Sequence, residues 1–151
     1  MGGREGIMVY IEDTGSSFRA PIDVVWKYIF GGGDHDKAHT STRSAEFKKV
    51  SDCTILYIAE RKYGAAWKRE TMRISFFPPI AMVQELLDGP LAGSKWTYVY
   101  SPQGKKTGIN VYGEFTSKSI PKSRLKKVAL AFLANEFAED APAVARLARG
   151  T

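Results

Sequence analysis

The segment over residues 88–115 constrains the fold more than any other part of the chain, because its pattern predicts a β-hairpin with an aromatic first strand. Trp96, Tyr98 and Tyr100 alternate with small or polar residues. Alternate side chains of a strand point to the same face of its sheet. One face of the predicted sheet therefore carries large rings with polar tips, and the turn at residues 102–104 ends this strand.

The other predicted strands are runs of β-branched and aromatic residues that end at glycine, proline or aspartate. Together with the hairpin they cover residues 8–19, with an irregular middle at Gly15, and residues 44–50, 54–63, 67–77, 80–87, 95–100 and 107–116. This pattern gives about seven strands of an antiparallel sheet.

Two short helices are predicted after the first strand. Pro21 suits a first helical position, and an apolar stripe follows it at helical spacing. Asp34 can cap the second short helix, over residues 34–39. The stripe of the first helix consists of Ile22, Val25, Trp26, Ile29 and Phe30.

A long helix is predicted from Pro121 towards Arg149, because this segment is rich in strong helix formers and carries a wide apolar band. We expect a kink or a restart at Pro142, with Asp140 as the new cap. A curved antiparallel sheet against one long helix can enclose a cavity, so the order of elements favours binding of an apolar small molecule.

Length and composition limit the alternatives. A chain of 151 residues predicts one domain over residues 1–151, and its one cysteine, Cys53, excludes an internal disulfide and favours the cytoplasm. No targeting signal is evident, and the longest apolar runs fall well short of the about 18 residues that cross a bilayer. The net charge of +6 favours anionic partners.

The segments FRAPIDVVWKYI, GPLAGSKWTYVY and KTGINVYGEF resemble the START-like (SRPBCC) superfamily, particularly its polyketide cyclase/dehydrase and lipid-transport branch. The resemblance implies an α+β helix-grip fold, in which the curved sheet wraps on the long C-terminal helix. It also implies an elongated hydrophobic cavity for a lipid-, quinone- or polyketide-like ligand. The preferred prediction is a protein that binds or carries such a ligand; the alternative is a cyclase or dehydratase acting on a polyketide-like substrate in the same cavity.

The candidate ligand-binding residues combine aromatic rings with polar groups, because buried polar tips need partners that a ligand or water can supply. A charged group inside the sheet would have a shifted pKa and could act as an acid or base, and Arg69 or Glu114 is the predicted inward charge. The predicted ligand-binding set is Trp67, Arg69, Trp96, Tyr98, Tyr112, Phe132 and His39.

His35 and His39 are the only histidines, and on a helix their spacing places them on one face, where they could chelate a metal with Asp34 or Asp36. No HExxH signature is present, so the sequence favours a site without a metal and predicts no cofactor. A role for a histidine in ligand contact or acid/base chemistry stays open beside a purely structural one.

Basic residues gather at the start of the predicted last helix without an acidic neighbour. A solvated basic face is the favoured interpretation, and transient contact with an anionic membrane surface is the alternative. Nucleic acid is not predicted as a partner, since no RNP1 pattern or zinc-finger spacing occurs, and the sequence makes no prediction of oligomeric state. The cluster comprises Lys118, Lys122, Arg124, Lys126 and Lys127.

Overall fold

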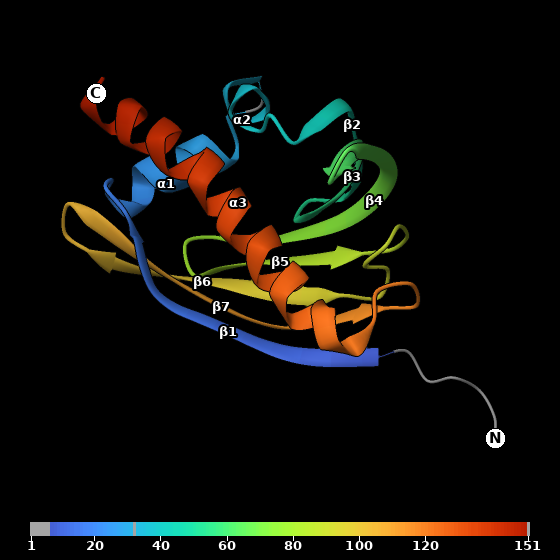
Figure 1. Cartoon of the computed structure of the whole chain (residues 1–151). Coiled ribbons are helices and arrows are strands. Elements are labelled where there is room, and N and C mark those ends of the chain that lie inside the picture. Colours follow the sequence, from blue (N-terminus) through green and yellow to red (C-terminus); the bar gives the residue numbers. More distant parts are fainter. Residues whose placement is uncertain (1–6, 32, 151) are drawn as a thin grey trace.

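A single curved sheet holds all seven strands of the computed structural model, which describes residues 7–31 and 33–150 (Figure 1). Every neighbouring pair of strands is antiparallel, and the order across the sheet is β1-β7-β6-β5-β4-β3-β2. The strands are β1 (Ile7–Phe18), β2 (Thr42–Ser51), β3 (Thr54–Tyr63), β4 (Ala66–Phe77), β5 (Ala81–Leu86), β6 (Lys95–Gln103) and β7 (Lys106–Ser117).

Three helices complete the fold: α1 (Ile22–Ile29), α2 (Gly33–Ala38) and α3 (Lys122–Arg149). Figure 1 shows α3 crossing the concave face of the sheet, with its C-terminal half beside α1 and α2. This is the helix-grip arrangement that the sequence predicts. Among the described helices, none is long and apolar enough to cross a membrane.

The predicted irregularity in β1 is confirmed. The pairing of β1 with β7 shifts register between Asp13 and Ser16, and Gly15 between them has φ of +91°. Only glycine adopts this backbone conformation without a steric penalty. The resulting bulge bends β1 and helps the sheet to curve around α3.

The first short helix begins at Ile22, with Pro21 as its N-cap residue rather than its first helical residue. It buries Val25 and Trp26 as its apolar stripe predicts, but Phe30 is exposed and Tyr28 is buried instead. The second begins at Gly33, so His39 directly follows it. The side chain of Asp34, predicted to cap it, lies outside the described residues.

Of the kink or restart predicted at Pro142, the restart is wrong, because α3 continues as one helix through this residue. A proline inside a helix removes one backbone hydrogen bond. Packing offsets that loss, since Leu133 before Pro142 and Val144 after it are both buried. Asp140 is therefore an interior helical residue whose side chain is free for other contacts.

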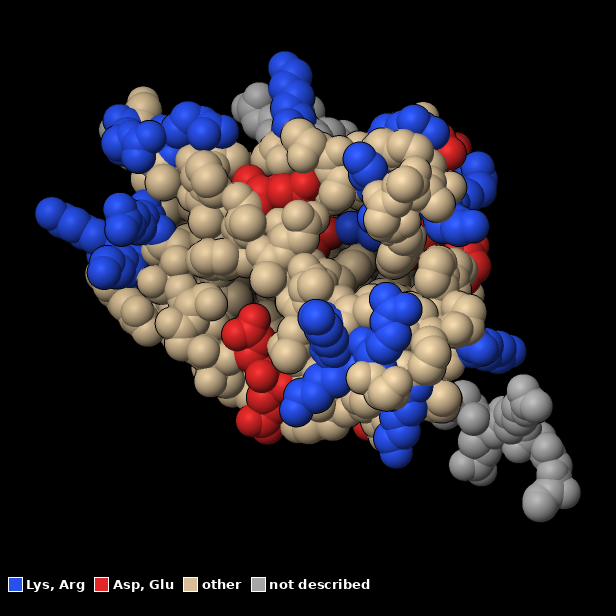
Figure 2. All heavy atoms as spheres, in the orientation of Figure 1, with Lys and Arg blue, Asp and Glu red and all other residues tan. Residues whose placement is uncertain are grey.

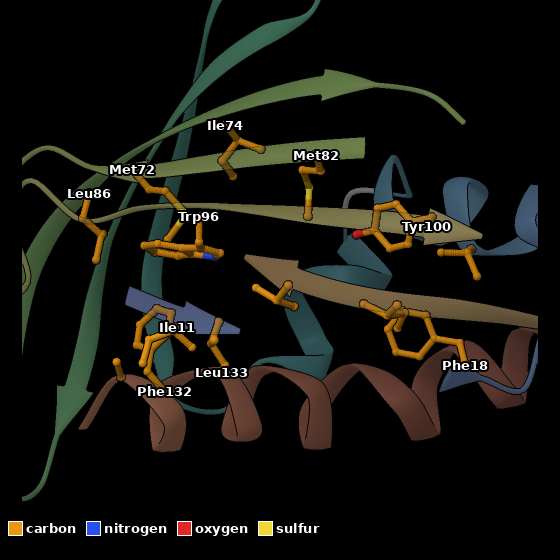
Figure 3. Packing of buried hydrophobic residues seen from close by; sticks show 14 of the residues in the cluster. Ile11, Phe18, Met72, Ile74, Met82, Leu86, Trp96, Tyr100, Phe132 and Leu133 are labelled. Atoms are coloured by element: carbon orange, nitrogen blue, oxygen red, sulfur yellow. The ribbon is translucent and has the colours of Figure 1, made fainter. Parts of the chain in front are cut away.

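Aromatic rings from β6, β7 and the first half of α3 pack together in the hydrophobic core. Trp96 stacks on Phe115 with ring centroids 4.8 Å apart. Phe132 meets Trp96 edge to face at 5.4 Å (Figure 3). Gly113 lies opposite Trp96 in the sheet, where a Cβ atom would collide with the backbone of β6 and the Trp96 side chain. The glycine thus allows the indole to lie flat against the sheet.

Candidate functional site

A cavity of about 110 Å³ lies between the sheet and the second half of α3. Its volume is of the same order as the about 150 Å³ apolar cavity that binds benzene. Most of its wall is apolar or aromatic, and that part of the wall consists of Phe18, Tyr28, Ile29, Phe47, Tyr57, Met72, Ile74, Met82, Tyr98, Tyr100, Ile109, Val111, Leu133 and Phe137.

Strand alternation places the rings of β6 at this wall. Tyr98 is paired with Val111 and Tyr100 with Ile109, and all four line the cavity. Figure 3 shows Met82 and Tyr100 projecting from the sheet towards α3. Burial raises the pKa of both Tyr98 and Tyr100, so these phenols stay neutral and act as hydrogen-bonding groups.

The polar part of the wall lies where α2 meets α3. His35 Nε2 is 3.4 Å from Asp140 Oδ1, and His39 Nε2 is 2.9 Å from the same oxygen. The Tyr28 hydroxyl donates a 2.6 Å hydrogen bond to this oxygen as well. His39 Nδ1 contacts Glu139 Oε1 at 2.8 Å and Glu136 Oε2 at 3.2 Å.

Electrostatics favour charged forms in this cluster. Burial opposes the charge of His39, but the hydrogen bond to Asp140 and the charge of Glu136 outweigh it and raise its pKa to about 10. Burial likewise opposes the Asp140 carboxylate, yet hydrogen bonds from His35 and His39 hold its pKa well below the usual value. The protein with no bound cation thus carries an ion pair in the cavity wall at neutral pH.

Glu139 fixes the connection between α2 and β2. Its carboxylate accepts hydrogen bonds from the backbone amides of Thr40 and Ser41, from both of their hydroxyls, and from His39. Burial opposes ionisation, but the bonds from His39 and Ser41 keep the Glu139 pKa below its usual value. The backbone beside His39 is thereby held against α3.

A second charged network borders the cavity. The Arg61 guanidinium, 7% exposed, donates to Glu70 Oε1 at 2.6 Å and also to Glu136. Tyr63 donates to the other oxygen of Glu70. Burial raises the Glu70 pKa, against the charge of Arg61, which lowers it. Arg61 also lies over the Phe132 ring at 4.5 Å, so it joins the core to the polar wall.

The predicted ligand-binding residues fall into three groups. Tyr98 and His39 line the cavity. Trp96 and Phe132 lie in the packed core, and the other three lie away from the cavity wall. Trp67 is half-buried beneath the Arg43 guanidinium, Tyr112 lies on the opposite face of β7 from Val111, and Arg69 is exposed.

The prediction of which charged residues point into the interior of the sheet is wrong. Arg69 and Glu114 are both exposed, whereas Arg61 and Glu70 are buried. Arg69 and Glu70 are neighbours on β4, so a shift of one residue in the assumed phase of alternation accounts for the error. The side chains of Asp34 and Asp36 lie outside the described residues, and the carboxylate placed between the two histidines is that of Asp140.

The acidic groups of the site follow one another along α3 at positions 136, 139 and 140. Residues three and four apart share a helix face, so this spacing was a readable signal for a carboxylate cluster. Sequence reasoning missed it because nothing in the chain indicated that α2 would face this part of α3. The basic cluster at the start of α3 is exposed, and Figure 2 shows basic side chains gathered there.

A comparison of the chain with known protein families gave no match, and neither did a comparison with curated proteins. Solved structures do share its architecture. The Zhui aromatase/cyclase from a Streptomyces species superposes with a TM-score of 0.75 at 13% sequence identity, covering 94% of this chain and 94% of its own.

Two further structures have the same arrangement of elements. A START superfamily protein from Mycobacterium smegmatis has a TM-score of 0.75 at 11% identity, over 93% of this chain and 98% of its own. Norcoclaurine synthase from Thalictrum flavum, in complex with dopamine and hydroxybenzaldehyde, has a TM-score of 0.67 at 13% identity, over 97% and 93%. The chain therefore has the START-like helix-grip fold, as its sequence predicts.

Proposed function

We propose that this protein binds a hydrophobic or amphipathic small molecule in the cavity between the sheet and the second half of α3. The observation that carries this proposal is the composition of the wall, in which mostly apolar and aromatic side chains are combined with a few polar and charged ones. Ligand sites of proteins combine these two features, since the apolar part supplies affinity and a few polar groups fix orientation.

The size and charge of the site narrow the ligand class. A cavity of about 110 Å³ suits a ligand part of roughly ring size, with longer parts requiring movement of the wall. The hydroxyl groups of Tyr98 and Tyr100 and the His39–Asp140 pair provide hydrogen bonds for a polar end. The solved relatives include an aromatase/cyclase and a synthase in complex with two small aromatic molecules, which supports an aromatic or polyketide-like ligand.

A cyclase or dehydratase acting on a polyketide-like substrate is the second candidate. The observation in its favour is an acid/base pair, His39 and Asp140, in the cavity wall. Proton transfer is fastest when the pKa of the catalytic group lies near the working pH. The pKa of His39 is about 10 and that of Asp140 is lowered, which favours a fixed ion pair that orients a ligand over a proton shuttle.

Binding can be tested with the purified protein and a defined probe. Native mass spectrometry followed by extraction identifies any retained molecule, and calorimetric titration with 2-naphthol measures affinity for a ring-sized aromatic. Val111→Phe fills the cavity and should abolish 2-naphthol binding. Val99→Phe is the matched control on the neighbouring strand, because Val99 lies between Tyr98 and Tyr100 and faces away from the cavity.

The expected result is binding of one equivalent of 2-naphthol to the parent chain and to Val99→Phe, but not to Val111→Phe. Absence of both a retained ligand and 2-naphthol binding would count against the proposal, as would equal binding by the two variants. A cytoplasmic location and transient contact of the basic cluster with an anionic membrane stay predictions.

A further inference from the structure

The two histidines and one aspartate of the cavity wall meet at a single point. The Nε2 atoms of His35 and His39 lie 3.4 Å and 2.9 Å from Asp140 Oδ1, and the three residues each offer a ligand atom within 4.8 Å of those of the other two. We propose that His35, His39 and Asp140 bind a divalent transition-metal ion at the wall of the cavity.

The other nitrogen of each imidazole supports this assignment. His35 Nδ1 lies 3.3 Å from the Ile29 carbonyl oxygen, and His39 Nδ1 lies 2.8 Å from Glu139 Oε1. A histidine that binds a metal typically donates its second ring N–H to a backbone carbonyl or a carboxylate. Both rings have such an acceptor at Nδ1, so with the ring proton on Nδ1 the Nε2 atom near Asp140 is the one available to a metal ion.

The two separations from Asp140 Oδ1 fit a common ion. Two ligand atoms held about 2.0–2.1 Å from one metal lie about 2.9 Å apart when the bonds meet at a right angle and about 3.4 Å apart at the tetrahedral angle. The two separations from Asp140 Oδ1 have these values. Two imidazoles and a carboxylate suit Zn²⁺ and the neighbouring first-row ions.

Charge balance supports a cation as well. The carboxylates of Glu136, Glu139 and Asp140 all contact His39 or its neighbours, and Glu136 shares the Arg61 guanidinium with buried Glu70. Negative groups therefore outnumber the permanent positive charge in this part of the molecule. A dication would neutralise more of this charge than a proton on His39 does.

The outer contacts of the site are already ordered. Glu139 is anchored by the amides of Thr40 and Ser41, and Tyr28 holds Asp140 through its hydroxyl. His35, His39 and Asp140 all line the cavity. A donor atom of a molecule in the cavity could therefore complete the coordination shell, which would join the metal site to the ligand site.

The test uses the full chain without a histidine tag, stripped with a chelator and titrated with Zn²⁺ by calorimetry. We expect one ion per chain. Asp140→Asn should weaken binding by at least the about 10- to 100-fold that loss of an outer-shell partner costs a metal site. Asp13→Asn is the matched control, because Asp13 lines the same cavity and belongs to neither metal-binding cluster.

Cys53→Ser should leave the affinity for Zn²⁺ unchanged, which separates the proposed site from the exposed thiol. Nitrogen-15 NMR of the imidazoles provides a measurement on the unmodified protein. Because the chain has two histidines, Zn²⁺ should shift two Nε2 signals and leave two protonated Nδ1 signals.

No stoichiometric binding of Zn²⁺, equal binding by Asp140→Asn and Asp13→Asn, or unchanged imidazole signals would overturn the proposal. The assay contains no organic ligand, so its outcome is independent of 2-naphthol binding. A failed metal test therefore leaves the proposed binding function in place, and a failed binding test leaves the metal site in place.

Discussion

The two halves of α3 face the same sheet but meet it differently. In the first half, Leu125, Ala129 and Phe132 are buried, and Phe132 packs on the rings of Trp96 and Phe115. In the second half, the sheet and helix enclose a cavity. The helix contributes Phe137 and Asp140 to its wall, together with Leu133 and Glu136.

This difference shows how one architecture separates stability from binding. The packed half provides dispersion contacts and apolar burial that hold sheet and helix together. The cavity half gives up part of that contact and places charged groups against the cavity instead. We therefore expect substitutions in the packed half to lower stability strongly, and those in the cavity half to alter binding more than stability.

The largest effect is expected for Phe115→Ala in the packed half. Phe115 is fully buried and stacks on Trp96, so its removal should lower the free energy of unfolding by about 4 kcal/mol. Urea unfolding followed by circular dichroism measures this change. Phe77→Ala is the control, because Phe77 is 51% exposed, and it should change stability by less than about 1 kcal/mol. Similar losses for both variants would contradict the distinction.

Arg61 lies at the boundary between the halves, and Arg61→Met should lower the free energy of unfolding by about 3 kcal/mol. The reason is that the substitution keeps the apolar stem but leaves Glu70 and Glu136 without their cation. The same urea experiment applies. Arg73→Met removes an exposed pair with Glu85 and should cost less than about 1 kcal/mol. A loss for Arg61→Met no larger than that of the control would show that the buried network contributes little.

The smallest effects test packing directly by adding atoms to each half. Ala129→Leu overfills the packed half and should cost about 2 kcal/mol, although leucine is a good helix former. Val111→Ile adds one methylene to the cavity wall and should stabilise by up to about 0.8 kcal/mol. Thermal unfolding compares both with Ala134→Leu on the exposed face of α3. If Ala129→Leu and Val111→Ile changed the stability in the same direction, the two halves would not differ in packing.

The sequence predicted the fold well because its signals are local. The alternation of Trp96 and Tyr100 predicted that both rings share one face of β6, which is the buried face in the structure, and Gly15 marked the bulge in β1. Tyr98 and His39 both line the cavity, but no local pattern in the sequence brings these two residues together. The arrangement of sheet and helix was predicted from the resemblance to START-like proteins, because local patterns do not specify it.

The charged part of the site was much harder to predict. Asp140 meets His39 across about a hundred residues of chain, so no local spacing joins them. The proline at position 142 even suggested a helix cap at Asp140, whereas packing on both sides keeps α3 continuous. The choice between Arg69 and Glu70 depended on strand phase, which a half-polar strand does not specify.

The carboxylate of Glu139 also restrains how the cavity wall can move. It accepts five hydrogen bonds from three successive residues of the α2–β2 connection. Any outward movement of that connection from α3 must break these bonds together, so the opening should be cooperative. The rate of ligand exchange along this side of the cavity would then be set by the rate at which the Glu139 carboxylate loses these hydrogen bonds.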